Sequence, residues 1–267
     1  MSPKLPMGVA TMYRAPAGKS CCFKKSKELN SMWACLPKVK RLSKRIRCFW
    51  DKLIATEIRA SLAHNIVMEK NINERLRQRA SQHFLDSIAV KQEAEKLLPE
   101  SVAKGVLAMV DCLRNGGKVM ACGNGGSAAD AQHFAAELVG RFERERQELA
   151  AIALTTDTSI LTAIGNDYSY DEIFSKQVRG LGKKGDILLG ISTSGNSKNV
   201  IKAIEAAKKL GMKIIAFTGN GGGKISQLLD KDDIHLCAPS TRTARIQETH
   251  LVLLHALCDG VDHVLLD

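Results

Sequence analysis

Two pairs of side chains in this sequence have the types and the spacing needed for proton transfer. His133 and Glu137 are four residues apart in a helix-like stretch, so they lie on one face of that helix. Gln247 and His255 are eight residues apart in a C-terminal helix, about 80° around its axis, so both can border one cavity. Moving a proton between two adjacent carbons needs a base near both carbons and an acid near the oxygens that they carry. We expect Glu137 to be that base and His255 that acid.

The same four side chains are also a possible set of ligands for a divalent metal ion. Imidazole and carboxylate groups favour zinc-like ions, whereas a glutamine is a weak ligand. A helical His–Glu contact without any ligand is a common outcome of the same spacing. The metal hypothesis therefore needs His133, Glu137, Gln247 and His255 together, while His250 projects elsewhere and is interpreted as structural.

A glycine-rich run, Gly123-Asn124-Gly125-Gly126-Ser127, follows an apolar strand-like segment and opens a helix-like one. Three glycines let the chain turn tightly and bring backbone N–H groups against a ligand. Ser127 stands where the dinucleotide motif has its third glycine, so we do not expect a dinucleotide site. A simple turn is the alternative interpretation of this run.

A second strand-to-helix junction carries four hydroxyl groups within six residues, at Ser192, Thr193, Ser194 and Ser197. Hydroxyl groups and the free N–H groups of a helix start suit a phosphate dianion. No Gly-Lys-Ser/Thr sequence follows, which disfavours an ATP-type loop. Ser197 alone would suffice for a helix N-cap. The other three hydroxyl groups therefore favour a phosphate ester as the ligand.

Alternating apolar strands and helices must position these residues. Strands this apolar are buried on both faces, and the alternation implies parallel pairing through right-handed crossovers. We expect an α/β fold in one domain, residues 68–267: a doubly wound, flavodoxin-like sheet of five parallel strands flanked by helices, with ligands at the carboxyl ends of the strands. The expected strands are 118–122, 150–154, 186–191, 213–217 and 233–237, and the expected helices are 72–97, 99–113, 127–139, 197–210 and 245–265.

The net charge of +11 is confined to the N-terminal quarter of the chain. Residues 1–70 hold 15 Lys and Arg against 4 Asp and Glu, so the remaining residues hold 24 of each sign. Nucleic-acid binding by the domain is therefore not expected. We interpret residues 1–67 as a basic extension, disordered or weakly helical, or as a stretch upstream of a natural start at Met68; a nucleic-acid arm is less favoured.

Cysteine usage and hydropathy indicate the compartment. The four cysteines after residue 70 lie in apolar runs without Cys-x-x-Cys spacing, as expected of buried, reduced thiols in a cytosolic protein. Nowhere is there an uninterrupted apolar run of the ~20 residues that cross a bilayer. We expect a cytoplasmic protein that does not enter a membrane.

Residues 122–141, Gly165-Asn166-Asp167, the hydroxyl run 192–197 and the run 245–250 closely resemble the bacterial phosphoheptose isomerases of the sugar isomerase (SIS) domain family. The resemblance covers residues 70–267. It implies interconversion of D-sedoheptulose 7-phosphate and D-glycero-D-manno-heptose 7-phosphate, the first step toward the ADP-heptose of lipopolysaccharide core. It also implies a cytoplasmic homotetramer with sites between subunits and one zinc ion per subunit.

The resemblance also implies roles for single residues. The family's metal ligands fall on His133, Glu137, Gln247 and His255, and its base and acid on Glu137 and His255. Two departures are residues 1–67, which have no counterpart in the family, and Ala244, where some members carry an acidic residue. Substrate contacts fall on Asn124, Gly125, Gly126, Ser127, Glu137, Asn166, Asp167, Ser192, Thr193, Ser194, Ser197 and Gln247.

Two other functions in the same family remain as alternatives. The chain also resembles the SIS protein that associates with the DnaA initiator, a binding factor in replication control. That branch characteristically lacks the groups found here at Glu137 and His255, which favours the isomerase. A SIS-domain transcription regulator is disfavoured because residues 1–67 show no helix-turn-helix.

Overall fold

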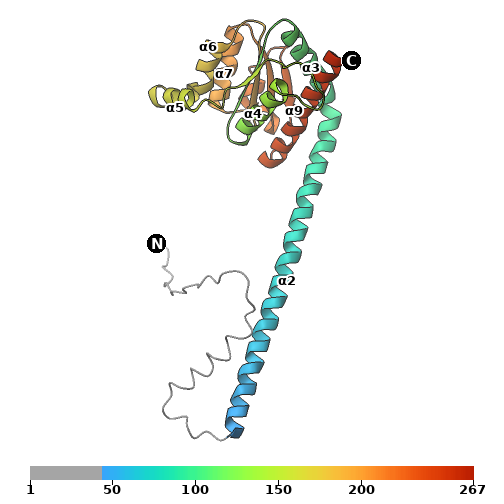
Figure 1. The fold of residues 1–267 in the computed structure, drawn as a ribbon, viewed down its shortest axis with the longest axis vertical. Helices are drawn as coiled ribbons and strands as arrows, with labels where there is room; N and C mark the ends of the chain where they lie inside the picture. Colours follow the sequence, from blue (N-terminus) through green and yellow to red (C-terminus); the bar gives the residue numbers. More distant parts are fainter. Residues whose placement is uncertain (1–43) are drawn as a thin grey trace. The chain divides into compact units, whose positions relative to one another are not determined.

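The structure is a computed structural model of the 267-residue chain and describes residues 44–267 (Figure 1). The chain divides into two compact units, Met1–Arg75 and Leu76–Asp267. The second unit contains every residue that the sequence places in the candidate site, and the sheet lies within it.

The described part of the first unit is helical, whereas the order of the extension as a whole stays a prediction. Helix α2 spans Lys44–Leu97, so it begins well before the predicted start at residue 72. No Gly or Pro interrupts this stretch, which removes the strongest helix breakers. Residues 1–43 of the predicted extension lie outside the described residues.

The second unit is built on a five-stranded sheet with the order β2-β1-β3-β4-β5, in which all pairs are parallel. This confirms the predicted doubly wound α/β class. All five predicted strands form. The two strand-to-helix junctions follow β1 and β3, and β1 pairs with both β2 and β3. The strands are β1 (Val119–Gly123), β2 (Ala151–Ala153), β3 (Ile187–Ser192), β4 (Lys213–Thr218) and β5 (Ile234–Cys237).

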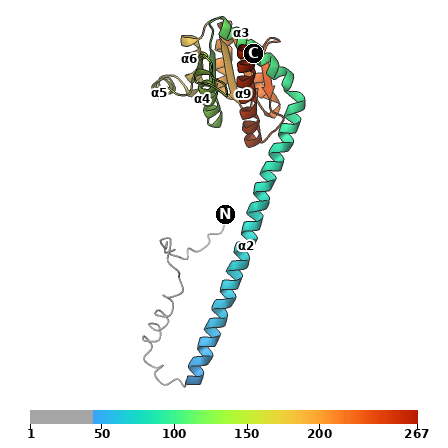
Figure 2. The ribbon, with the colours of Figure 1, turned by 45° about the vertical axis from the view of Figure 1, so that its right-hand side comes forward.

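Successive side chains of the strands point into two separate cores, as the period of a strand requires. One core takes Val119 and Ala121 of β1 and packs under α3 (Pro99–Arg114), α4 (Gly126–Val139) and α9 (Thr243–Leu266). The other takes Met120 and Cys122 and packs under α6 (Ile173–Leu181) and α7 (Lys198–Lys209). Both views show α6 on the opposite side of the sheet from α9 (Figure 2). Helices α4 and α9 therefore lie on the same face of the sheet, together with the predicted site residues that they carry.

Residues 155–185, to which the sequence analysis assigned no element, contain two helices and a turn of 3₁₀ helix. Asp157 caps α5 by accepting a hydrogen bond from the N–H of Ile160, and Ser169 does the same for the N–H of Asp171. The elements are α5 (Thr158–Asp167), η1 (Tyr170–Glu172) and α6. Two further short elements, η2 (Asn220–Gly222) and α8 (Gly223–Ser226), lie between β4 and β5.

Among the described residues, α9 is the single helix long and apolar enough to cross a membrane by length and composition. Its Leu254, Leu257 and Val261 are completely buried in the core beneath α3 and α4. Its apolar character is therefore that of a core helix.

Candidate active site

Helices α4 and α9 bring together three of the four residues predicted for chemistry. Nε2 of His133 lies 2.7 Å from Oε1 of Glu137, across one turn of α4. The imidazole of His255, on α9, meets the His133 ring edge-on with 5.1 Å between ring centroids. The side chains of His133 and Glu137 are 39% and 21% exposed, so the cluster is partly shielded yet reachable from solvent.

Core packing explains why these side chains meet. Phe134 and Leu138 of α4 are fully buried in the core that α9 also covers. His133 directly precedes Phe134, and Glu137 directly precedes Leu138. Because one residue corresponds to about 100° around a helix, the side chains of His133 and Glu137 point away from the core, to the edge of the contact with α9. On that edge Phe142, from the loop after α4, also packs against His255, with 5.4 Å between ring centroids.

The fourth predicted residue, Gln247, lies at the other end of the same helix pair. A Cβ added to Gly126 would come within 2.4 Å of the Nε2 atom of Gln247, so the start of α4 and the α9 amide touch directly. A larger residue at position 126 would require the Gln247 side chain to move. The glycine-rich turn is thereby joined to the helix that carries His255.

The donor types of this set fit a zinc ion. Two imidazoles, one carboxylate and one amide oxygen are all ligands that zinc accepts in proteins. Within residues 44–267, however, no three His, Cys, Asp or Glu side chains converge as a metal site. His133 and Glu137 are bonded to each other, so each would exchange that bond for one to the ion.

Asp130 is a carboxylate of α4 that the sequence analysis did not single out. Its Oδ2 atom is buried and has no hydrogen-bond partner. Burial raises the pKa of Asp130, and the neighbouring His133 opposes that effect. The spacing of Asp130, His133 and Glu137, three and then four residues, is the signal that places all three on one side of a helix.

The turn after β1 is tied to the turn after β3 by a pair of amides. Asn124 donates through Nδ2 to Oδ1 of Asn199 at 2.9 Å, and Asn199 donates back to Oδ1 of Asn124 at 2.8 Å. The hydroxyl of Tyr170 also donates to Oδ1 of Asn124, at 3.3 Å. Gly125 has a φ of 56°, in the left-handed region that glycine tolerates. The predicted contact residue Asn124 thus also organises the two loops.

The hydroxyl run after β3 does not serve as a helix cap. Ser197 occupies the N-cap position of α7, but its side chain makes no capping hydrogen bond. Its hydroxyl lies 2.9 Å from that of the buried Ser192 instead. Thr193 and Ser194 lie nearer to solvent. The first N–H groups of α7 are therefore not capped by Ser197, which is the arrangement an anion site needs.

Asn166 and Asp167, two further predicted contacts, lie at the end of α5. Both are exposed, and Nδ2 of Asn166 donates to Oδ1 of Asp167 at 2.8 Å. Their contact with substrate stays a prediction.

Sequence reasoning missed Asn199, Tyr170, Phe142 and Asp130 as members of this region. Asn199 lies two residues after the hydroxyl run, so its position in the first turn of the next helix was a usable signal. Tyr170 and Phe142 lie in segments without periodicity, and no local pattern places them beside Asn124 or His255.

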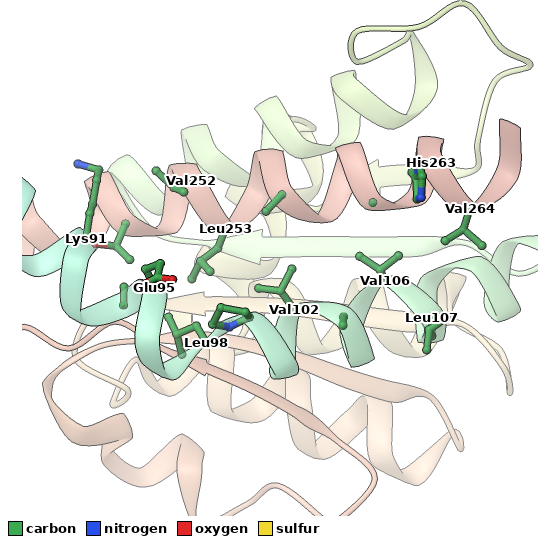
Figure 3. Close-up of a pocket in the computed structure, with 16 residues that line it drawn as sticks. Lys91, Glu95, Leu98, Val102, Val106, Leu107, Val252, Leu253, His263 and Val264 are labelled. Carbon is green, nitrogen blue, oxygen red and sulfur yellow. The ribbon is translucent and has the colours of Figure 1, made fainter. Parts of the chain in front are cut away.

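An apolar groove of about 580 Å³ lies on another side of α9 and holds none of the predicted site residues (Figure 3). Val102 of α3 and Leu253 of α9 line it, and Lys91, Glu95 and His263 add polar groups. Apolar side chains also stand exposed around it and on α2, among them Phe84, Leu107 and Val252. Exposed apolar surface of this kind is typical of a contact with another protein chain.

Comparison with known proteins yields one consistent family. Residues 82–219 match the model of the SIS domain. The phosphoheptose isomerase of Dechloromonas aromatica is 64% identical over 188 residues, which are 70% of this chain and 96% of that protein. A phosphoheptose isomerase of Neisseria gonorrhoeae is 62% identical over 192 residues, 72% of this chain and 98% of that protein.

Solved structures give the same result. The phosphoheptose isomerase structure from Neisseria gonorrhoeae superimposes with a TM-score of 0.68 and 58% identity, covering 70% of this chain and 99% of that one. The structure of a phosphoheptose isomerase from Francisella tularensis has the same TM-score, 48% identity and covers 97% of its chain.

Proposed function

Because the chain belongs to the SIS domain family and to its phosphoheptose isomerases, we propose that it interconverts D-sedoheptulose 7-phosphate and D-glycero-D-manno-heptose 7-phosphate. The observation that supports this most is the meeting of Glu137, His133 and His255 where α4 packs on α9. A carboxylate and an imidazole on two helices of one core are the groups that an enediol-type proton transfer requires.

In the proposed mechanism the two junctions hold the phosphate and the helix pair acts on the other end of the sugar. The N–H groups of Lys198 and Asn199 at the start of α7, which Ser197 does not cap, bind the dianion together with Thr193, Ser194 and Ser197, supported by the α7 dipole. The backbone of Gly125, Gly126 and Ser127 approaches the sugar from the start of α4.

Glu137 then removes a proton from the hydroxyl-bearing carbon next to the carbonyl, while His255 donates a proton to the carbonyl oxygen, which gives the enediol. Glu137 returns its proton to the former carbonyl carbon, and His255 takes back a proton from the hydroxyl oxygen of the neighbouring carbon, which becomes the aldehyde. His133 holds the Glu137 carboxylate in place through their 2.7 Å contact. A zinc ion held by His133, Glu137, Gln247 and His255 would supply a Lewis acid for the carbonyl or keep Glu137 and His255 in register.

We further propose that the protein acts in the cytoplasm as a homotetramer, on the first step toward the ADP-heptose of lipopolysaccharide core. The exposed apolar side chains of α2, α3 and α9 support assembly with further copies. Cys112, Cys122 and Cys258 are free, buried thiols, which agrees with a reducing compartment. Asn166 and Asp167 are proposed to act at a site completed by assembly, since they are exposed within one chain.

Turnover by the purified full-length chain tests this function. Sedoheptulose 7-phosphate is added and formation of the aldose phosphate is followed, with and without a chelator and with zinc restored afterwards. We expect turnover, its loss with chelator and its recovery with zinc. A folded oligomer that binds DnaA at physiological salt and does not turn over the sugar would contradict the isomerase and support the replication-control alternative.

A further inference from the structure

We propose that Arg146 and Asp262 are positioning residues for the isomerase reaction. Their buried ion pair holds the end of α4, which carries Glu137, against the face of α9 that carries His255. The inference rests on the proposed function for the roles of Glu137 and His255. The positioning role of Arg146 and Asp262 rests on the geometry of their ion pair.

The ion pair is almost fully removed from solvent. Nε of Arg146 donates to Oδ1 of Asp262 at 2.7 Å, and both side chains are only 3% exposed. Two buried charges lose most of their hydration, so an isolated pair of this kind gives little net stability. Oδ2 of Asp262 is moreover buried without a hydrogen-bond partner. Stability alone is therefore a weak reason for this pair to be present.

The rest of the Arg146 guanidinium binds the end of α4. Nη2 donates to the carbonyl oxygen of Glu137 at 2.7 Å, and Nη1 donates to that of Leu138 at 2.8 Å. These carbonyls belong to the last turn of α4 and have no intrahelical partner. A cation at this end also suits the helix dipole. Arg146 thus fixes the backbone of the residue that we propose as the base.

Asp262 supplies the other half of the connection. It follows His255 by seven residues in α9, which places the two side chains within about 20° of each other around the helix. The loop that carries Arg146 also carries Phe142, whose ring packs against His255. The short segment after α4 therefore makes three contacts at the site. Arg146 binds the backbone of Glu137 and the side chain of Asp262 on α9, and Phe142 packs against the ring of His255.

The ionisation of Cys258 agrees with this crowding. Burial is the main reason that the pKa of its thiol is raised to about 12, and the carboxylates of Glu137 and Asp262 contribute to the rise. Arg146 acts in the opposite direction. The base, the ion pair and α9 therefore share one small region of the core.

The test replaces the ion pair by apolar side chains of similar size, Arg146→Met with Asp262→Leu in one protein. Such replacements of a buried pair are often neutral or stabilising, so the protein is expected to fold. We expect kcat for the heptose phosphate to fall ~10- to 100-fold, because a shift of about 1 Å between reacting groups has effects of this size. KM should stay within about twofold, since the phosphate loops are untouched.

The matched control removes a neighbouring ion pair. Arg144 and Asp267 join the same loop to the same helix, at 2.8 Å, but with side chains 49% and 45% exposed. The double variant Arg144→Gln and Asp267→Asn should keep the wild-type kcat and KM. A second control, Asp186→Asn, removes a fully buried carboxylate from its 2.5 Å pair with Lys118. It should lower stability without lowering kcat per folded molecule.

Unchanged kcat in the apolar double variant would overturn the inference. If that variant does not fold, Arg146→Lys replaces it: lysine keeps a charge for Asp262 but cannot also bind both α4 carbonyls, so kcat should still fall and KM stay constant. Full activity of Arg146→Lys would equally overturn it.

A crystal structure of the folded variant separates this inference from the proposed function. We expect the His133 and His255 rings to move apart from their 5.1 Å centroid distance. If they superpose on the wild-type positions, the positioning role is excluded, whether or not the wild type turns over the heptose phosphate. If the wild type has no turnover while the rings do move, the proposed function fails and the positioning by Arg146 stands.

Discussion

Glu137 is the residue on which the proposed chemistry depends most. Its carboxylate is 21% exposed and contacts His133 at 2.7 Å, while its backbone carbonyl is bound by Arg146. The side chain and the main chain of the base are therefore restrained by different partners. A carboxylate held in this way loses little freedom when a substrate binds, which favours proton transfer over a short distance.

Glu137→Gln should lower kcat by about 10²- to 10⁴-fold, the usual contribution of a general base. The glutamine keeps the size of the side chain, so binding of sedoheptulose 7-phosphate, measured by calorimetry, should remain detectable. Glu93→Gln is the matched control, because Glu93 is an exposed carboxylate of α2 paired only with Lys96. Turnover of Glu137→Gln close to that of the control would exclude Glu137 as the base.

The strand-to-helix junctions act as one unit at the scale of elements. Hydrogen bonds between Asn124 and Asn199 join the turn after β1 to the first turn of α7. Asn199 is 3% exposed, so its amide cannot exchange these bonds for water. The glycine at 195 adds a second close approach, since a Cβ there would lie 2.0 Å from the carbonyl oxygen of Gly222. The two loops of the proposed phosphate site are thus held together by the protein's own contacts.

Asn199→Leu should weaken sugar-phosphate binding and spare the chemical step. The substitution leaves the Asn124 amide without its buried partner, at a cost of ~1–3 kcal/mol, and we expect KM to rise about tenfold. The control is Asn115→Ala, which removes an exposed amide at the end of α3, before β1 begins. Steady-state kinetics of the two variants gives the comparison; an unchanged KM in folded Asn199→Leu would contradict a joint phosphate site.

Stability at the scale of the whole domain depends on keeping some ionisable groups neutral. His250 of α9 is fully buried and donates from Nε2 to the carbonyl oxygen of Thr218 at 2.8 Å, and among the described residues its Nδ1 has no partner. Burial lowers the pKa of His250 to about 4, against an ordinary value of about 6.5. It is a structural histidine, as its position between Gln247 and His255 led us to expect.

Acid should therefore destabilise the fold through His250. The unfolded chain protonates this residue below about pH 6.5 while the folded chain does not, so the free energy of unfolding falls as the pH drops toward 4 and levels off below it. Between pH 7 and pH 5 the loss is about 2 kcal/mol. Urea unfolding of the wild type and of His250→Gln at both pH values measures it.

The difference between the two proteins isolates this histidine from other groups that titrate. The His250→Gln protein should be less stable at pH 7, because glutamine fits the site less well, but should lose less stability between pH 7 and pH 5. Equal losses in both proteins would show that His250 is not kept neutral by the fold.

Sequence patterns were sufficient for the α/β class and for the positions of the two strand-to-helix junctions, while ligand binding at these junctions stays a prediction. Strand and helix periodicity, glycine-rich turns and runs of hydroxyl groups act over a few residues, so their effect can be inferred locally. All five strands and the two strand-to-helix junctions were predicted on this basis. The length of α2 was not predicted. Its N-terminal part is basic and has no apolar periodicity, so the sequence pattern did not indicate a helix there, although the stretch contains no Gly or Pro.

The contacts that complete the site depend on packing between segments far apart in the chain. Glu137 and His255 are 118 residues apart, and they meet because α4 and α9 cover the same face of one sheet. For the same reason no local pattern shows that Arg146 pairs with Asp262 or that Asn124 pairs with Asn199. Spacing can place a side chain on a face of its helix, but the partner of that face is chosen by the order of the strands and the volumes of the buried side chains.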